Sequence, residues 1–275
     1  MSAPPPAVAQ VVVKANKVGT FLGRHPWVLD KSVVAPAEPP RDGDEVNLVT
    51  SQGRFVARGI YNGHSHIRVR LYSWTEGERL DESFWRRRLQ AAIDLRRLIG
   101  YDDPQGAARL VFSEADGLSG LIVDRYRDWL VVQLAALAVA VRKDLLVRLL
   151  AELVAPKGIH LRTDQKIAAA EGIEPLDGVA WGEAAGPWTT IREHGLIYQV
   201  DLSEGQKTGY YLDQRENRLA AARYLRGRRV LDMFCYAGGF ALAAARLGRA
   251  AEVLGVDSSE RALEQARANA KANGI

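Results

Sequence analysis

Apolar residues along the chain follow two different periods, and the changes between them divide the chain into segments. Between residues 10 and 75 they recur at every second position, most clearly in residues 54–61 and 66–72. This spacing is typical of strands that bury one face. Asn62 and Gly63, which stand between the two runs, are a strong signal for a hairpin turn. We therefore expect a small β-rich domain over residues 10–75.

A helical period follows at residues 81–99. Its apolar stripe consists of side chains three or four positions apart, namely Trp85, Leu89, Ala92 and Ile93. Asp81 is the expected N-cap of this helix, and Gly100 is expected to end it. The polar residues 75–79 that precede the helix mark a domain boundary.

A mixed α/β middle domain is predicted over residues 76–204. Short apolar runs within it predict several strands, and residues 142–154 predict a helix that ends before Pro156. The turn between its last two strands is expected at residues 193–195. At the other end of the chain, residues 1–9 are rich in proline and alanine and are expected to form a disordered tail.

The last segment, residues 205–275, alternates helix and strand patterns. Residues 229–233 and 252–257 predict buried strands, each followed by a helical period. Asp213, with Glu216 three positions later, predicts a capping box at the start of another helix. The segment is expected to be the first, incomplete part of a Rossmann-like domain. The whole chain is thus predicted to be an α/β multidomain protein.

Composition narrows the class of protein. The chain has 275 residues, a net charge of +4 and one cysteine, Cys235. A single cysteine excludes an intramolecular disulfide and favours a reducing compartment, so we expect the cytoplasm. No apolar run reaches the roughly 18 residues that a membrane span needs. The mild positive charge is compatible with nucleic acid, although a solvated helix surface explains each single arginine cluster more readily than RNA contact does. His64 and His66 are interpreted as surface histidines, and no metal site is predicted.

The motif with the clearest chemistry is residues 230–240 (VLDMFCYAGGF). A strand pattern ends at Asp232, and a turn with Gly238 and Gly239 then opens a helix. In open α/β sheets, ligands bind outside the carboxyl ends of the strands. Asp257 ends the next strand about 20 residues on, which is where a carboxylate accepts from ribose hydroxyls. The spacing therefore predicts a nucleoside-containing cofactor.

The identity of that cofactor follows from what the turn lacks. A dinucleotide site needs G-x-G-x-x-G for its pyrophosphate, and this pattern is absent. Asp232 would repel a phosphate but suits the ammonium of an amino-acid group. S-adenosylmethionine is therefore favoured over NAD, and an NAD-dependent oxidoreductase remains an alternative. A tightly packed turn without any ligand is the simplest competing interpretation.

A second motif lies at residues 205–218 (GQKTGYYLDQRENR). The G-x-x-x-x-G-K-[ST] spacing of a phosphate-binding loop is absent, so by itself the segment predicts a polar loop that leads into a helix. Together with residues 230–240 it resembles bacterial 23S ribosomal RNA cytosine-5 methyltransferases. Three upstream segments are similar to that family's N-terminal PUA domain, an RNA-binding β-barrel: residues 24–28, 43–46 and 67–70. Residues 112–118 and 120–126 are similar to its middle domain.

The resemblance implies S-adenosylmethionine-dependent methylation of cytosine C5 in large-subunit ribosomal RNA, with that RNA as the partner. Four residues are expected to wall the cofactor pocket: Lys207, Thr208, Gly209 and Tyr211. Five are expected to hold the methionine end: Asp232, Phe234, Tyr236, Gly238 and Gly239. Asp257, with Ser258 beside it, is expected to bind the ribose. In the PUA-like segment, Arg24, Arg68 and Arg70 are candidate phosphate contacts. A homodimer is one possible oligomeric state.

Members of that family continue with an Asp-Pro-Pro-type motif and a catalytic cysteine that attacks cytosine C6. This chain ends at Ile275, and Cys235 stands in the cofactor turn, where a small buried residue is expected. No catalytic residue is therefore predicted here, and the 275-residue chain is expected to be inactive by itself. A non-catalytic RNA-binding protein is the alternative from another class.

Overall fold

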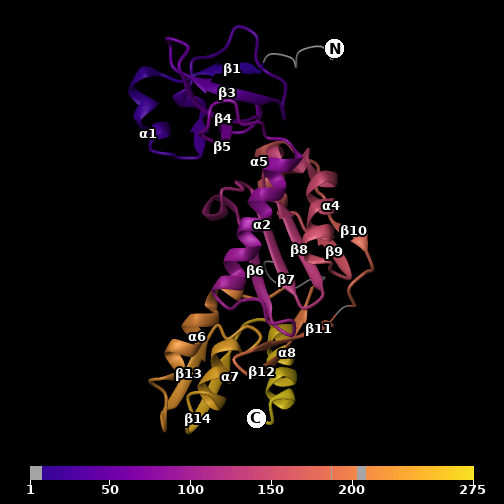
Figure 1. Ribbon diagram of the computed structural model, residues 1–275. Helices are drawn as coiled ribbons and strands as arrows, with labels where there is room; N and C mark the ends of the chain where they lie inside the picture. The colour runs from indigo at the N-terminus through magenta and orange to yellow at the C-terminus, as the bar shows by residue number, and fades with distance from the viewer. Residues whose placement is uncertain (1–7, 187, 203–208) are drawn as a thin grey trace. The chain divides into compact units, whose positions relative to one another are not determined.

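The computed structural model describes residues 8–186, 188–202 and 209–275 (Figure 1). The chain divides into two compact units. The first, here unit 1, consists of Met1–Arg96, Leu110–Val123 and Val132–Glu183. The second, unit 2, consists of Arg97–Arg109, Asp124–Val131 and Ala184–Ile275. No helix in these described ranges is long and apolar enough to cross a membrane. The predicted tail at residues 1–9 lies almost wholly outside them.

Unit 1 begins with a five-stranded sheet in the order β1-β3-β4-β5-β2. Its strands are β1 Ala9–Val12, β2 Trp27–Leu29, β3 Glu45–Val49, β4 Phe55–Tyr61 and β5 Ile67–Ser73. All five strands contribute buried residues to one core, among them Val11, Val28, Val46, Leu48 and Val69. The predicted β-rich domain is confirmed. The short helix α1 (Val18–Leu22) and β2 were not predicted, because neither is long enough to show a period.

The helix α2 (Glu82–Leu98) follows as predicted. Its start is fixed by Asp81, whose Oδ1 accepts a hydrogen bond from the Phe84 amide at 3.1 Å. Phe84, Trp85 and Leu89 are buried on the apolar stripe. Gly100 follows the helix with a φ of +76°, a conformation that favours glycine at helix ends.

A second five-stranded sheet has the order β10-β9-β8-β7-β6. Its strands are β6 Ala107–Phe112, β7 Leu121–Tyr126, β8 Trp129–Leu134, β9 Gly158–Leu161 and β10 Gly178–Gly182. Three helices accompany them, α3 Leu137–Ala140, α4 Lys143–Val154 and α5 Gln165–Glu171. The residues of β6, β7 and β8 are shared between the two units. The mixed α/β character is confirmed, while α3, α5 and β10 were not predicted.

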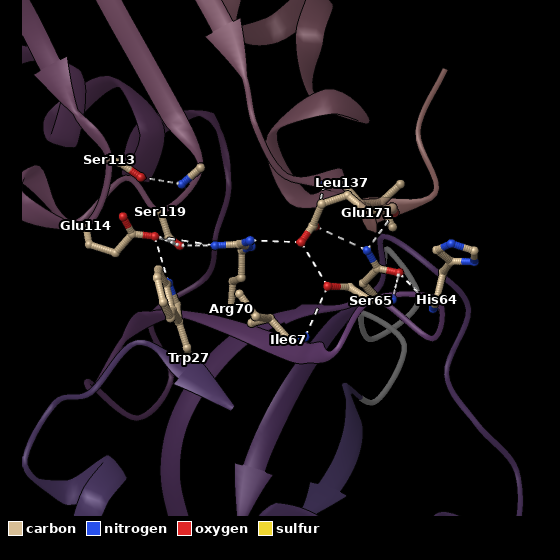
Figure 2. Close-up of polar contacts among 12 residues, drawn as sticks. Trp27, His64, Ser65, Ile67, Arg70, Ser113, Glu114, Ser119, Leu137 and Glu171 are labelled. Carbon is tan, nitrogen blue, oxygen red and sulfur yellow. Dashed lines mark hydrogen bonds and ion pairs between the residues drawn. The ribbon is translucent and has the colours of Figure 1, made fainter. Parts of the chain in front are cut away.

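A polar network centred on Arg70 joins the first sheet to the rest of unit 1 (Figure 2). Arg70 Nη2 donates to Glu171 Oε1 at 2.9 Å, and Arg70 Nη1 donates to Ser119 Oγ at 3.1 Å. Glu114 Oε1 lies 3.4 Å from the same Nη1 and accepts from Trp27 Nε1 at 2.7 Å. Because Arg70 is 8% exposed and already paired with carboxylates, the expectation that it contacts RNA phosphates is wrong.

Unit 2 contains the hairpin β11 (Trp188–Glu193) and β12 (Leu196–Asp201). His194 and Gly195 form the turn between them with φ values of +50° and +81°, as primed hairpin turns require. The predicted turn at this position is confirmed. Inward residues of both strands, Ile191, Tyr198 and Val200, share a core with Tyr126 and with the helix α7 described next.

The remaining elements of unit 2 are the helices α6 Arg215–Ala222, α7 Gly239–Arg246 and α8 Glu260–Ala272, and the strands β13 Arg229–Met233 and β14 Glu252–Val256 (Figure 1). The strands pair in parallel, with Asp232 opposite Gly255. One face of the β13–β14 sheet packs against α7. On the other face, Leu231 and Leu254 are each 59% exposed. The prediction of a buried strand at residues 229–233 is therefore wrong in this structure.

The predicted capping box is also wrong. Asp213 lies inside a 3₁₀ turn, Leu212–Gln214, and α6 begins only at Arg215 with no side-chain cap bond. Glu216 Oε1 instead accepts from the Tyr101 hydroxyl at 3.1 Å. The helix α8 does have the expected kind of cap, since Ser259 Oγ accepts from the Ala262 amide at 3.2 Å.

Candidate functional site

A cavity of about 450 Å³ lies at the carboxyl ends of β13 and β14 in unit 2. We call it the cofactor cavity. Its lining residues come from the segment before α6, from α6, from the turn between β13 and α7, and from the end of β14: Tyr210, Tyr211, Gln214, Arg218, Asp232, Phe234, Cys235, Tyr236, Gly239, Phe240, Asp257 and Ser258. This is the place where open α/β sheets bind ligands.

Two carboxylates stand in this cavity, Asp232 near the end of β13 and Asp257 directly after β14. Asp257 Oδ2 accepts from the Tyr236 amide at 2.8 Å, and its Oδ1 accepts from the Ser259 amide at 2.9 Å. Asp232 Oδ2 accepts from the Ala241 amide at 2.9 Å, near the start of α7. Burial raises the pKa of Asp232 above its usual value, and the nearby charge of Asp257 acts in the same direction. The cavity therefore favours a cationic ligand.

The turn that follows β13 has an unusual backbone. Phe234 and Tyr236 have φ values of +64° and +50°, a region that side chains with a Cβ rarely occupy. Such strain persists only where surrounding contacts hold it, and it is common at ligand sites. Here it leaves Phe234 82% exposed. The Tyr236 ring packs edge-on against Tyr211 at 5.5 Å, and its hydroxyl donates to the Gly209 carbonyl at 3.3 Å.

The two glycines of the turn are packed against the protein itself. A Cβ on Gly239 would lie 3.0 Å from the Tyr210 hydroxyl oxygen and 3.2 Å from Arg218 Cδ. Gly238 has a φ of +79°, and a Cβ there would lie 2.7 Å from Leu242 Cδ1. Gly239 lines the cofactor cavity, whereas Gly238 does not.

A buried ion pair supports one wall of the cavity. Arg218 donates from Nε to Glu193 Oε1 at 2.6 Å and from Nη2 to Glu193 Oε2 at 2.8 Å. Its Nη2 also donates to the Tyr211 carbonyl at 3.1 Å, and its guanidinium lies 4.6 Å from the centre of the Tyr210 ring. Arg218 thus ties the Tyr210–Tyr211 segment to the end of β11, and its charge is already neutralised by Glu193.

Cys235 lines the cavity but is poorly suited to nucleophilic attack. It is 6% exposed. Burial raises the pKa of its thiol, and the charges of Asp232 and Asp257 raise it further. Because its pKa is raised, the thiol of Cys235 stays protonated near neutral pH. The thiolate is the reactive form, so Cys235 is a poor nucleophile. The interpretation of Cys235 as a small buried residue agrees with this environment.

Most of the site residues predicted from the sequence meet in this cavity. Seven of them line it: Tyr211, Asp232, Phe234, Tyr236, Gly239, Asp257 and Ser258. Gly209 does not line the cavity, but its carbonyl accepts a hydrogen bond from the hydroxyl of Tyr236, which does. Gly238 lines a neighbouring pocket instead. Lys207 and Thr208 fall outside the described residues. Within the described ranges, no group of three His, Cys, Asp or Glu side chains could hold a metal ion.

Five lining residues were not predicted, namely Tyr210, Gln214, Arg218, Cys235 and Phe240. For two of them a signal was present. Gln214 and Arg218 are four positions apart at the start of α6, and residues at this spacing share one face of a helix. The polar residues at this spacing could therefore have indicated that the start of α6 also lines the site.

The sequence matches two protein families. Residues 11–74 match a PUA-like domain, and residues 113–275 match the S-adenosylmethionine-dependent methyltransferases. Among curated relatives, a ribosomal RNA large subunit methyltransferase I from Erwinia tasmaniensis is 38% identical over 266 residues, which are 97% of this chain and 67% of the relative. The enzyme of the same name from Aeromonas hydrophila is 40% identical over 270 residues, with 97% and 67% covered.

Solved structures agree on the fold. A chain from Streptococcus mutans described as a SAM-dependent methyltransferase superposes with a TM-score of 0.81 at 21% identity, covering 98% of this chain and 68% of that one. A methyltransferase complexed with SAH gives the same TM-score of 0.81, also at 21% identity, with 98% and 67% covered. The chain therefore belongs to the S-adenosylmethionine-dependent methyltransferases, with a PUA-like domain ahead of a Rossmann-like fold.

Proposed function

We propose that this protein transfers a methyl group from S-adenosylmethionine to cytosine C5 in large-subunit ribosomal RNA. The observation that carries the proposal is the pair of carboxylates, Asp232 and Asp257, in one cavity at the ends of neighbouring parallel strands. The RNA substrate is supported by the PUA-like domain and by the names of the relatives. The C5 position rests on the sequence resemblance.

The residues of the cavity fit the cofactor by their chemistry. Asp257 would accept hydrogen bonds from the ribose hydroxyls, with Ser258 beside it. Asp232 would face the ammonium of the methionine part, together with Phe234, Tyr236, Gly238 and Gly239. Gly209 and Tyr211, with Lys207 and Thr208, would form the wall next to it. We propose these roles residue by residue.

When bound, S-adenosylmethionine supplies a methyl group on a positively charged sulfur. The residues described here bind and orient that group. Two carboxylates attract its positive charges, and the tyrosine wall of Tyr210 and Tyr211, supported by Arg218, limits the access of water. Cys235 holds its proton and takes no part in attack on the base. The cytoplasm and the oligomeric state, for which a homodimer is one possibility, stay predictions.

The cofactor assignment is tested by calorimetric titration of the 275-residue chain with S-adenosylmethionine and, separately, with NAD. We expect saturable binding of S-adenosylmethionine and none of NAD. Binding of NAD alone would contradict the assignment and favour the oxidoreductase alternative.

The substrate assignment needs a second assay. The protein is incubated with labelled S-adenosylmethionine and unmodified large-subunit ribosomal RNA, and the nucleosides are separated by mass spectrometry. Label in 5-methylcytidine is the expected result, and label in another nucleoside would overturn the C5 proposal.

A further inference from the structure

The contacts that hold the Arg218 side chain leave one nitrogen of its guanidinium unused. Arg218 is 3% exposed and lines the cofactor cavity. Its Nε and Nη2 donate to the two carboxylate oxygens of Glu193, and Nη2 also donates to the Tyr211 carbonyl. This bidentate pairing occupies one edge of the guanidinium. Among the described residues Nη1 has no hydrogen-bond partner, so it can serve a ligand of the cavity.

This nitrogen lies beside the start of α7. A Cβ on Gly239 would be 3.4 Å from Nη1. Gly239 and Phe240 are the first two residues of this eight-residue helix, and both line the cavity. Within the part of the chain that the structure describes, neither of their amides has a partner, as is usual in the first turn of a helix. Such amides carry partial positive charge, and together with Nη1 they favour an anion.

The Tyr210 hydroxyl is another unpartnered donor at the same place. Tyr210 is 2% exposed, and its hydroxyl bonds to no described residue. Tyr198, whose ring lies 5.2 Å away, directs its hydroxyl to the Gly239 carbonyl at 3.4 Å instead. Burial raises the pKa of Tyr210 well above its ordinary value, so the hydroxyl keeps its proton. A Cβ on Gly239 would lie 3.0 Å from this oxygen. A buried hydroxyl without a partner calls for one.

The cofactor cavity therefore has two poles of opposite character. The acidic pole is Asp232, whose Oδ2 accepts from the Ala241 amide at 2.9 Å, two residues after Gly239. The donors around Gly239 form the other pole. A ligand that carries an ammonium and a carboxylate on one carbon atom satisfies both poles at once. The methionine part of S-adenosylmethionine has this composition, whereas a phosphate would bring only negative charge close to Asp232.

We propose that these donors, namely Arg218 Nη1, the first amides of α7 and the Tyr210 hydroxyl, form a subsite for the carboxylate of the methionine part. We call it the carboxylate subsite. The proposal rests on the proposed function and adds a determinant of specificity to it. Glu193 is a positioning residue, because it fixes the guanidinium and neutralises its charge. Recognition then depends on directed hydrogen bonds, and a site built to bond one group rejects an analogue that lacks it.

The test compares S-adenosylmethionine with its decarboxylated analogue, which keeps the adenosine, the sulfonium and the ammonium. Both are titrated calorimetrically into the 275-residue chain. We expect S-adenosylmethionine to bind at least about ten-fold more tightly, because the analogue cannot accept the charged hydrogen bond from Nη1. Equal affinity for the two ligands would overturn the carboxylate subsite and leave the proposed function standing. Binding of neither ligand would contradict both.

Variants assign this preference to Arg218. Arg218→Met should lower the affinity for S-adenosylmethionine about ten-fold and leave that for the analogue unchanged. Because this change strands the buried carboxylate of Glu193, the Glu193→Gln/Arg218→Met double variant removes both charges and should lose the preference equally. Arg223→Met is the matched control, since Arg223 is exposed at the end of α6 and outside the cavity. A preference that persists in the double variant, or disappears in Arg223→Met, would overturn the assignment.

Discussion

Arg70 and Glu171 form a buried ion pair across 2.9 Å although 101 positions separate them in the chain. Glu171 accepts four further hydrogen bonds from three donors in unit 1. Its carboxylate accepts from Ser65 Oγ, from Asn62 Nδ2 and from the Leu137 amide at 3.2 Å, and its backbone carbonyl accepts from the same Asn62 Nδ2. Figure 2 shows how these contacts meet between the first sheet and the ends of α5 and α3. The pair therefore joins two parts of unit 1 that the sequence places far apart.

Removal of one partner should be costly. Arg70→Met leaves Glu171 buried without its cation, and we expect a loss of about 3–5 kcal/mol in the free energy of unfolding. Arg68→Met, on the same strand but bonded only to backbone carbonyls, should cost less than about 1 kcal/mol. Urea unfolding followed by circular dichroism measures both variants. Equal effects would show that the buried network does not stabilise unit 1.

The ribose contact of the cofactor is tested by Asp257→Asn. Loss of a charge-assisted hydrogen bond should weaken S-adenosylmethionine binding by about 1.5–3 kcal/mol. Glu260→Gln removes an exposed carboxylate at the start of α8, just after Asp257, and should leave the affinity within about 0.5 kcal/mol of wild type. Calorimetry of both variants decides the assignment, and unchanged affinity in Asp257→Asn would remove it.

Gly239→Ala tests the packing of the glycine turn. The new Cβ would meet the Tyr210 hydroxyl at 3.0 Å and Arg218 at 3.2 Å, so the tyrosine wall must move. We expect at least a ten-fold loss of S-adenosylmethionine affinity and a destabilisation of about 1–3 kcal/mol. Gly19→Ala is the control, because nothing lies within 4 Å of a Cβ there. Wild-type behaviour of Gly239→Ala would mean that the wall adapts without cost.

Cofactor binding should weaken in mild acid. Burial raises the pKa of Asp232, so this carboxylate becomes protonated at a higher pH than an ordinary aspartate, whose pKa is 3.8. Its attraction for a cation is present above that raised pKa and is lost as the pH falls through it. Affinity measured from pH 7 downward should therefore decline before ordinary aspartates titrate. In Asp232→Asn the affinity should be lower at pH 7 and this part of the decline should be absent.

Cys235 should react slowly. The raised pKa of its buried thiol leaves little thiolate at pH 7. We expect iodoacetamide to modify it at least ten-fold more slowly than a cysteine in a short peptide, with a rate that rises steeply above pH 9. Reaction at the peptide rate would show that the turn opens readily.

The sequence predicted those parts of the molecule that repeat a local pattern. Strands β3, β4 and β5 and the helix α2 have five or more residues and a clear period, and all were found. β2, with three residues, carries too few side chains to show an alternation. The carboxylates of the cofactor cavity were found because Asp232 lies near the end of β13 and Asp257 directly follows β14, and strand ends are readable in sequence.

Other features depend on contacts between distant positions. Arg70 resembled a surface cation because its partners Glu114 and Glu171 lie 44 and 101 positions away. Asp213 and Glu216 had the spacing of a cap, yet a 3₁₀ turn precedes α6 and Glu216 bonds to Tyr101 instead. Arg218 was overlooked because its ion pair with Glu193 forms across 25 positions. In each case the partner, and with it the role, is set by tertiary structure.

Unit 2 is formed from three separate stretches of the chain, and this sets the order in which its parts become available during synthesis. The Tyr126 hydroxyl is buried and accepts a hydrogen bond from the Tyr210 amide, 84 positions later, at 3.1 Å. At about 5–20 residues per second, a ribosome needs on the order of ten seconds to add the intervening chain. During that interval the first two stretches of unit 2 have emerged without the third, whereas every stretch of unit 1 is complete by Glu183. Newly made chains therefore pass through a stage in which unit 1 can fold while the buried side chains of Tyr126 and Val131 still lack their partners from residues 184–275.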